Sequence, residues 1–244
     1  MSHRYRFYIS PETATETEVT LSAEESHHAL RVARCRVGET VTLFDGRGRE
    51  LLGTVSDASE KACRVAVEDE RFQPEPSVRV ALVQACLNHE KVQDTLIARA
   101  TELGVSRMVF FQGEHSEHPS RHRDKWARIA IESCKQCGRA WLPELVEREN
   151  LEDALTSLSG YTLLVAALDS PASSLRDTLT GQRRVAIVIG PEGGLSDAEM
   201  EQVRNAGAIS LSLGNATLRS ELAATVAAGI VLYELGALGE SGNG

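Results

Sequence analysis

The sequence predicts an α/β protein in which a small β-barrel domain precedes a larger domain with a mainly parallel sheet. Short strand patterns and one helical pattern fill the first 72 residues, whereas strands and helices alternate from residue 78 onward. A proline-punctuated segment at residues 73–77 separates the two patterns. We therefore expect domains at residues 1–72 and 78–238, a linker at 73–77, and a frayed low-complexity tail at 239–244.

The predicted barrel domain contains one helix and several short strands. A helix is expected over residues 22–33, because Ser22 is a suitable N-cap and Glu25 follows three residues later. Residues 40–44 (TVTLF) alternate between apolar and polar, and they lead into the hairpin-turn signal DGRG at residues 45–48. Further short strands are expected at residues 50–55 and 64–67.

Strand and helix patterns alternate through the second domain. Residues 78–85 form an apolar run that is typical of a buried strand. Apolar residues recur at helical spacing over residues 90–103, and Gly104 is a suitable helix end. The final helix, residues 218–235, is apolar nearly all round, so we expect it to be deeply packed. The remaining expected elements are strands at residues 107–111, 161–168, 184–189 and 208–213, and a helix at 121–137.

Two glycine-bearing loops follow apolar strand patterns near the C-terminus. Residues 189–196 have the sequence IGPEGGLS, and residues 213–221 have the sequence LGNATLRSE. Glycine lets the backbone approach a ligand closely, and Pro191 stiffens the first turn. Ligand sites of parallel sheets lie where neighbouring strand ends break into such loops. The two loops therefore predict a ligand crevice at the carboxyl edge of the sheet.

The paired loops resemble those of SPOUT-type (α/β-knot) methyltransferases, which use S-adenosylmethionine. The pattern IGPEGG-x-S-x-x-E followed by LG-x-x-x-LR-x-E is similar to that of the bacterial 16S ribosomal RNA uracil-N3 methyltransferases, the RsmE family. Residues 26–38 and 45–46 resemble the PUA-like RNA-binding domain of that family, and residues 101–105 and 138–139 match its central motifs. The resemblance implies a PUA-like barrel followed by a trefoil-knotted methyltransferase domain. Periodicity alone does not predict a knot.

The resemblance also implies a cofactor between the two glycine loops. Backbone groups of the first loop would surround the adenosine side of the cofactor, and the second loop would form the opposite wall. The implied cofactor-binding residues are Leu168, Gly190, Pro191, Glu192, Gly193, Leu213, Gly214 and Leu218. Two tight turns that bind nothing are the alternative interpretation.

Methylation of uracil N3 requires loss of the N–H proton, because the neutral imide nitrogen has no useful lone pair. The site therefore needs aligned reactants, a proton acceptor or a water relay, and a positive group near the uracil oxygens, but no metal. Arg219 is the first candidate for a catalytic or substrate-orienting residue, because a guanidinium binds carbonyl and phosphate oxygens through its fork of donors. An ion pair with Glu192 or Glu221 is its structural alternative.

Glu192 and Glu221 are the candidate carboxylates near this site. Glu192 follows a proline in the first loop and is a candidate proton acceptor or cofactor contact. Glu221 lies near the start of the last helix, where an acid is favourable in any case. The sequence does not identify which of the two, if either, is the base.

The charge pattern points to RNA in spite of an acidic total. The formal net charge is −9, which by itself argues against a nucleic-acid partner. Residues 115–139, however, hold six Lys or Arg against three Asp or Glu. We interpret this stretch as part of an RNA path, with a solvated helix face as the alternative. The candidate phosphate contacts are Arg31, Arg34, Arg36, His115, Arg121, Arg123 and Arg139.

Other features bound the function. No apolar run approaches the length of a membrane span, and the N-terminus leads into no apolar segment of a secretory signal. Five scattered cysteines favour reduced thiols in a cytoplasm. Cys134 and Cys137 lack a second CxxC pair, so the sequence does not favour a zinc or redox site.

The chain departs from the family pattern at several positions. Asn215, Ala216 and Thr217 stand where Pro, Arg and Ile are usual. His115 stands where an arginine is usual, and Lys135 where an acid is usual. These differences bear on the nucleotide and the activity more than on the fold.

Together these observations predict an S-adenosylmethionine-dependent methyltransferase of a uridine N3 in small-subunit ribosomal RNA. By resemblance it acts on the 30S subunit in the cytoplasm as a homodimer, with the last helix and the knot region at the interface. Two alternatives stay open: a relative with another target, such as transfer RNA or a different ribosomal nucleotide, and a non-catalytic RNA-binding or ribosome-assembly factor. A nicotinamide-binding Rossmann protein is not favoured, because no G-x-G-x-x-G follows the first strand of the second domain.

Overall fold

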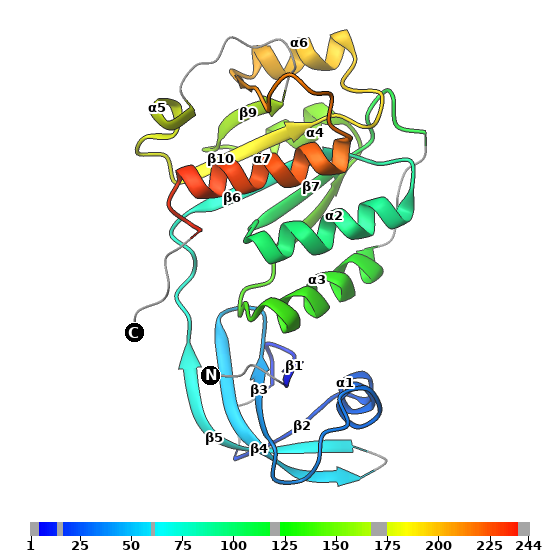
Figure 1. The fold of residues 1–244 in the computed structure, drawn as a ribbon, viewed down its shortest axis with the longest axis vertical. Coiled ribbons are helices and arrows are strands. Elements are labelled where there is room, and N and C mark those ends of the chain that lie inside the picture. Colours follow the sequence, from blue (N-terminus) through cyan, green and yellow to red (C-terminus); the bar gives the residue numbers. More distant parts are fainter. Residues whose placement is uncertain (1–4, 14–16, 60–61, 118–122, 167–174, 239–244) are drawn as a thin grey trace. The chain divides into compact units, whose positions relative to one another are not determined.

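The computed structural model describes residues 5–13, 17–59, 62–117, 123–166 and 175–238 (Figure 1). The chain divides into two compact units. The first comprises residues 1–75 with 131–142, and the second comprises residues 76–130 with 143–244.

The first unit is built on a five-stranded sheet with the order β1-β3-β4-β5-β2. β1 and β3 are parallel, and the other neighbouring pairs are antiparallel. The predicted turn after β3 is confirmed, because Asp45 Oδ1 accepts hydrogen bonds from the backbone N–H groups of Arg47 and Arg49. The strands are β1 (Arg6–Tyr8), β2 (Glu18–Thr20), β3 (Thr40–Phe44), β4 (Arg49–Ser59) and β5 (Ala62–Phe72).

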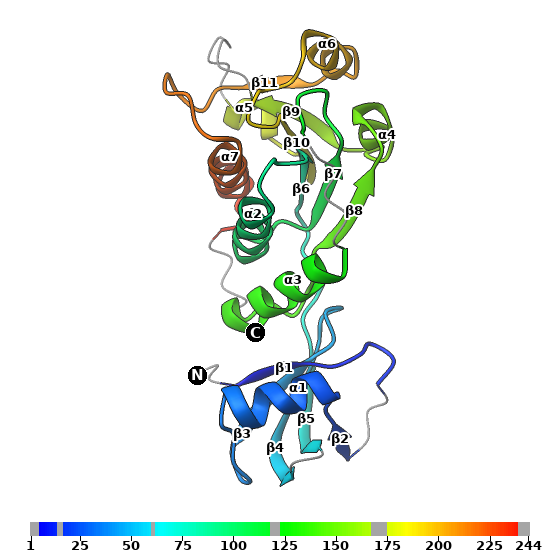
Figure 2. The ribbon, with the colours of Figure 1, turned by 90° about the vertical axis from the view of Figure 1, so that its right-hand side faces the viewer.

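A helical segment accompanies this sheet (Figure 2). It consists of α1 (Ala23–His27) and a continuing π-helical turn, η1 (His28–Val32). Ser22 Oγ accepts a hydrogen bond from the Glu25 backbone N–H at 3.2 Å, which confirms the predicted N-cap. Fully buried side chains of the sheet and the helical segment, among them Phe7, Ala29 and Leu43, form the core of this unit.

The strands of this unit differ in length from the expected ones. β4 and β5 each have 11 residues, whereas the sequence predicted short strands at residues 50–55 and 64–67. The second half of β5 is charged and exposed, so the sequence shows no alternation of apolar residues that would predict a strand there. Backbone pairing with β4 holds this half of the strand in place. β1 and β2 escaped prediction because each has only three residues.

The second unit contains a six-stranded sheet with the order β11-β9-β10-β6-β7-β8, and every neighbouring pair is parallel. The mainly parallel sheet predicted from the sequence is therefore confirmed. Its central strands β6 and β10 are paired from Arg184 with Arg79 to Ile189 with Gln84. The strands are β6 (Arg79–Ala85), β7 (Arg107–Phe111), β8 (Glu144–Arg148), β9 (Thr162–Ala166), β10 (Arg184–Ile189) and β11 (Ile209–Leu211).

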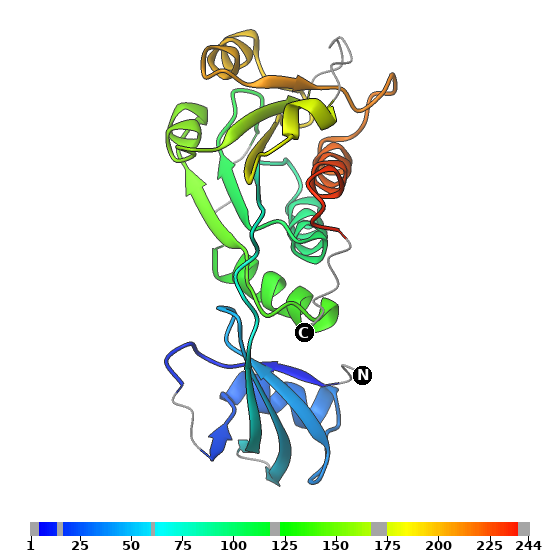
Figure 3. The same cartoon turned by 90° about the vertical axis from the view of Figure 1, so that its left-hand side faces the viewer.

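Helices cover both faces of this sheet (Figures 2 and 3). On one face, α2 (Glu90–Leu103) and α7 (Ser220–Glu234) lie side by side with the short α5 (Leu175–Leu179), and their apolar residues share one core with the strands. On the other face, α4 (Leu151–Thr156) and α6 (Asp197–Asn205) pack over a second core. This arrangement explains why the central strands are apolar on both sides.

Two helix ends match the expectations. Gly104 follows α2 in the left-handed conformation with φ +107°, as the sequence predicted. α3 (Arg123–Cys137) ends at the expected residue, and its fully buried Trp126 packs against Phe110 with ring centroids 4.6 Å apart.

α7 corrects one prediction. Its inner face is buried, as Ala224, Ala228 and Val231 show, but Leu222 and Tyr233 are exposed. The expected deep packing therefore holds for one side of the helix only.

The sequence analysis also missed β8 and α4, whose patterns contain no long apolar run. Within the described part of the chain, no helix combines the length and the apolar character needed to cross a membrane.

Candidate functional site

The two glycine loops leave the same edge of the parallel sheet. The first loop, residues 190–194, follows β10, and the second loop, residues 212–219, follows β11. β9 lies between these two strands. The segment after β9 is residues 167–174, and Leu168, an expected cofactor-binding residue, therefore lies outside the described residues.

The first loop folds back tightly on itself. The Gly194 N–H donates to the Pro191 carbonyl oxygen at 2.9 Å, and Gly194 has φ +76°. A Cβ atom on Gly190 would lie 2.6 Å from the Leu195 nitrogen and 2.7 Å from the Gly194 carbonyl carbon. Only glycine fits at position 190, so the loop presents backbone, not side chains, at the edge of the sheet.

α6 begins directly after this loop with a capping box. Ser196 Oγ accepts from the Glu199 backbone N–H, and a Glu199 carboxylate oxygen accepts from the Ser196 backbone N–H. The other Glu199 oxygen accepts from the Glu114 backbone N–H at 3.0 Å. The two oxygens of Glu199 thus join the loop after β7 to the loop after β10. The Glu199 side chain is buried, with the residue 4% exposed.

The second loop leads directly into α7. Gly214 has φ +104°, Leu213 and Leu218 are partly buried, and α7 starts at Ser220. Arg219 is exposed and is the N-cap residue, one position before the first turn in which the sequence placed it. Among the described residues Arg219 forms no ion pair with Glu192 or Glu221, so the structural alternative for this guanidinium finds no support.

Gln84, at the end of β6, joins the two loops and was not predicted. Its side-chain N–H groups donate to the Gly190 carbonyl oxygen at 3.1 Å and to Ser220 Oγ at 2.9 Å. Ser220 Oγ in turn donates to the Gly190 carbonyl oxygen at 2.5 Å. Gln84 is fully buried, and its Oε1 has no partner in the described part of the protein. A glutamine within an otherwise apolar strand was the available signal, because a buried polar group needs partners.

Glu192 holds the first loop against the loop after β6. Its carboxylate accepts from the Asn88 backbone N–H at 3.1 Å. Asn88 Oδ1 accepts in turn from the Glu117 backbone N–H at 3.0 Å. The loops after β6, β7 and β10 are thus connected by hydrogen bonds. Glu221 lies in the first turn of α7 and is partly buried.

His115 lies against the first loop. Its Nδ1 is 3.0 Å from the Gly194 carbonyl oxygen. A Cβ on Gly193 would lie 3.1 Å from the His115 Cβ, so the histidine also needs a glycine beside it. The sequence analysis places this residue among the RNA contacts, and the structure places it against the Gly190 loop.

The other candidate RNA contacts are spread over the molecule. Arg31, Arg34 and Arg36 are exposed at and after η1. Arg139 is partly buried, and this burial lowers the pKa of its guanidinium. Arg121 lies outside the described residues, and of Arg123 the structure describes only its place at the start of α3.

Part of the basic stretch is neutralised internally. Lys125 Nζ lies 2.6 Å from carboxylate oxygens of both Glu90 and Asp94. The hydrogen bonds to Asp94 and Glu90 raise the pKa of Lys125. This lysine therefore contributes less free positive charge than the sequence count implied.

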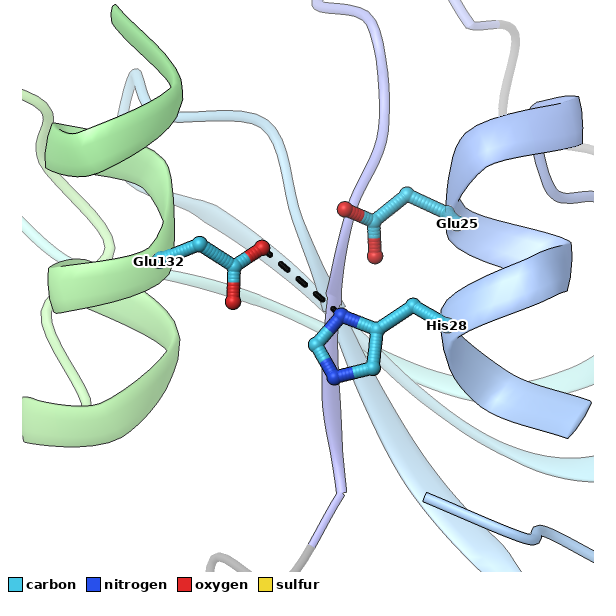
Figure 4. Close-up of side chains that lie close together, drawn as sticks. All are labelled: Glu25, His28 and Glu132. Carbon is cyan, nitrogen blue, oxygen red and sulfur yellow. Dashed lines mark ion pairs between the residues drawn. The ribbon is translucent and has the colours of Figure 1, made fainter. Parts of the chain in front are cut away.

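One cluster in the first unit has the composition of a metal site (Figure 4). Ligand atoms of Glu25, His28 and Glu132 lie within 4.8 Å of one another. The buried Lys135 ammonium, however, lies 3.0 Å from Glu25 Oε1, 2.7 Å from His28 Nδ1 and 2.7 Å from Glu132 Oε1. An internal cation already satisfies these groups, so the cluster is a buried ion network. Burial raises the pKa of Glu25, more than the ammonium lowers it.

Comparison with known proteins agrees with this architecture. Residues 73–232 match the family model described as RNA methyltransferase domain. The chain belongs to the RNA methyltransferase family. Residues 21–68 match the RNA methyltransferase PUA domain, which confirms the predicted PUA-like region.

Named relatives cover nearly the whole chain of this methyltransferase. The ribosomal RNA small subunit methyltransferase E of Synechocystis is 29% identical over 97% of this chain and 78% of its own. A protein of the same name from Neisseria gonorrhoeae has a crystal structure bound to S-adenosyl methionine. Its sequence is 26% identical to this chain, and the two structures match with a TM-score of 0.86 over 95% of this chain and 98% of that one. A Legionella pneumophila methyltransferase with bound SAM is 28% identical with a TM-score of 0.85 over 93% and 96%. The resemblance to the RsmE family is thus confirmed.

Replacement of Lys135 by methionine tests the ion network. The variant leaves the buried Glu25 carboxylate without its ammonium, and breaking a buried pair costs about 3 kcal/mol or more. Burial already raises the pKa of Glu25, and loss of the ammonium, which lowers this pKa, raises it further. The stability deficit of Lys135→Met therefore grows as the pH rises through the pKa of Glu25.

Urea unfolding of both proteins at pH 5 and pH 8 measures this difference. The double variant Glu25→Gln/Lys135→Met has no carboxyl at position 25, so its deficit changes less between the two pH values than that of Lys135→Met. A deficit of Lys135→Met that does not change with pH contradicts the assignment.

Proposed function

We propose that this chain transfers a methyl group from S-adenosylmethionine to N3 of a uridine in small-subunit ribosomal RNA. The observation that carries the proposal is the junction at Gln84, which joins the Gly190 loop to the start of α7 beside Arg219. The relatives named ribosomal RNA small subunit methyltransferase E support the substrate class. The S-adenosyl methionine in the Neisseria structure supports the cofactor.

The residues present fit such a cofactor. A Cβ on Gly190 would clash with the backbone of the same loop, so backbone groups are left at this edge of the sheet, and among the described residues the buried Gln84 Oε1 beside the loop has no donor. When bound, the cofactor supplies an electrophilic methyl group on a sulfonium. The residues that would hold it are Gly190, Pro191, Glu192 and Gly193 in the first loop, Leu213, Gly214 and Leu218 in the second loop, and Leu168 after β9.

Arg219 is assigned to the uracil. Its guanidinium is exposed at the start of α7, and it donates to the uracil oxygens as negative charge develops on the ring. Glu192 is assigned a supporting role, because its carboxylate accepts from the Asn88 N–H and so fixes the first loop. Glu221 stays a candidate in the first turn of α7.

RNA binding is assigned to exposed cations. Arg31, Arg34 and Arg36 lie at the surface of the first unit, within or beside the region that matches the PUA domain model. Such cations supply phosphate affinity without sequence specificity. The 30S subunit, in the cytoplasm, is the proposed setting.

The proposed oligomer is a homodimer that forms through α7. Leu222, Ile230 and Tyr233 are 41%, 37% and 65% exposed. Their spacing of eight and three residues places them on one side of the helix, opposite the buried alanines. A second copy of this helix is a partner of matching apolar character.

Cofactor binding by calorimetry is the first test. We expect S-adenosylmethionine to bind at micromolar concentration, and Gly190→Ala to weaken binding more than tenfold because a side chain there displaces the loop. Gly207→Ala is the matched control, because it strains a left-handed glycine (φ +81°) between α6 and β11 away from the loops. It lowers the melting temperature but leaves the affinity unchanged.

The alternatives give different results. Binding without methyl transfer to 30S subunits favours a non-catalytic assembly factor whose Asn215-Ala216-Thr217 segment no longer supports turnover. Transfer to another RNA favours a relative with a different target. No binding, with or without 30S subunits, contradicts the proposed cofactor site.

Replacement of Arg219 by alanine tests the substrate contact. We expect kcat to fall by about 100- to 1000-fold, as on loss of a donor to a developing anion, with cofactor affinity retained. Arg204→Ala, which removes an exposed arginine from the last turn of α6, leaves kcat unchanged. Equal rates for Arg219→Ala and the unaltered protein would show that this guanidinium is not used.

Replacement of Ile230 by glutamate tests the dimer. A charge in the centre of the apolar stripe has to be desolvated when two copies meet, so we expect a monomer in analytical ultracentrifugation. Val37→Glu, at a residue of the first unit that is 61% exposed, leaves the sedimentation coefficient unchanged. A monomeric unaltered protein, or a dimer that survives Ile230→Glu, argues against this interface.

A further inference from the structure

The proposed reaction needs a proton acceptor for N3–H, and two nearby carboxylates already have other partners. Glu192 accepts from the Asn88 backbone N–H. Glu199 accepts from the backbone N–H groups of Ser196 and Glu114 and is 4% exposed. The buried Glu199, with both oxygens engaged, is therefore not placed to receive a proton from a substrate.

The hydrogen bond of His115 fixes the tautomer of its neutral ring. A carbonyl oxygen carries no proton, so the proton between Nδ1 and the Gly194 oxygen, 3.0 Å apart, belongs to Nδ1. In a neutral imidazole the other nitrogen, Nε2, then has a free lone pair. The side chain is exposed, so this lone pair is accessible to a substrate.

The segment that carries His115 is fixed on several sides. The Glu114 N–H donates to Glu199 at 3.0 Å, Ser116 Oγ donates to the Cys86 carbonyl oxygen at 2.8 Å, and the Glu117 N–H donates to Asn88 at 3.0 Å. A catalytic group held in this way needs little reorganisation when it accepts a proton.

His115 and Arg219 flank the same short loop. His115 touches Gly193 and Gly194 at one end. The Gly190 carbonyl at the other end is bonded to Ser220, the residue after Arg219. The loop therefore has His115 against one end and the residue next to Arg219 bonded to the other.

We propose that His115 Nε2 accepts the N3 proton of the target uracil, an inference that rests on the proposed function. The N3–H bond breaks and its proton forms a bond to Nε2, which gives an imidazolium. The electron pair left on N3 forms the new bond to the methyl carbon, and the pair of the S–CH3 bond leaves with the sulfur as a neutral thioether. The imidazolium returns its proton to solvent before the next turnover.

Side-chain nitrogen NMR tests the tautomer without any turnover. When the imidazole ring of His115 is neutral, we expect its Nδ1 to be protonated and its Nε2 to be unprotonated. The two nitrogen signals are assigned by their loss in His115→Asn. A ring with the proton on Nε2 overturns the inference, whatever the activity of the protein.

Kinetics of His115→Asn test the proton transfer. The asparagine amide keeps a donor for the Gly194 oxygen but has no basic nitrogen. We expect kcat on 30S subunits to fall about 100-fold or more while the Kd of S-adenosylmethionine stays within twofold. Added imidazole restores part of the rate to His115→Ala. Glu117→Gln, which removes an exposed carboxylate from the same loop, retains full kcat.

The pH profile separates the histidine from the nearby carboxylates. In the described part of the chain, the titratable and charged groups on the joined loops and on α6, besides His115 itself, are Cys86, His89, Glu114, Glu117, Glu192, Asp197, Glu199, Glu201 and Arg204. We expect kcat of the unaltered protein to decrease toward acid pH and kcat of His115→Asn to lack this decrease. An unchanged kcat in His115→Asn, or a large loss in Glu221→Gln instead, overturns the inference and leaves the proposed function intact. An unaltered protein that methylates no uridine contradicts both.

Discussion

The hydrogen bonds that join Gln84, Gly190 and Ser220 are the interaction on which the rest of the site depends. Gln84 ends the central strand β6, Gly190 begins the loop after β10, and Ser220 begins α7. One buried amide thereby fixes the position of one glycine loop relative to the other. The two loops are far apart along the chain, since Leu213 follows Gly190 by 23 residues. Each such bond contributes only about 1 kcal/mol net, but leaving a buried partner unsatisfied costs more. The geometry of the crevice is therefore strongly constrained.

A second set of bonds extends this constraint across the edge of the sheet. Glu192, Glu199 and Asn88 connect the loops after β6, β7 and β10 through backbone N–H groups. These side chains act on backbone, so they stabilise loop positions and not a charge on a ligand. Arg219 and His115 are exposed at this edge of the sheet, and in our proposals they are the groups that act on the substrate.

Much of the fold could be predicted from the sequence, because the hydrophobic periodicity and the residues that begin or end an element indicate the same boundaries. The strand at residues 184–189, the helix over residues 90–103 and the Ser22 cap match the structure, since each depends on local pattern alone. β1, β2 and β8 could not be predicted, because they are short or polar and exist only through pairing with distant strands. The exposed side of α7 was missed because an apolar sequence does not show which of its faces is covered.

The candidate site divides in the same way. The glycine loops and Arg219 follow from sequence motifs, whereas Gln84 and the orientation of His115 depend on contacts 106 and 79 residues apart along the chain. Lys135 shows a related limit: it looked like a surface charge in a basic stretch, but it neutralises Glu25, which is 110 residues away. Long-range polar partners of this kind leave no periodic trace.

The most direct test of the account is to map the methyl group by mass spectrometry after the protein has acted on unmodified 30S subunits with S-adenosylmethionine. The account predicts a single N3-methyluridine in the small-subunit ribosomal RNA. A methyl group on a ribose, on another base or on transfer RNA, or no methyl group at all, would contradict it.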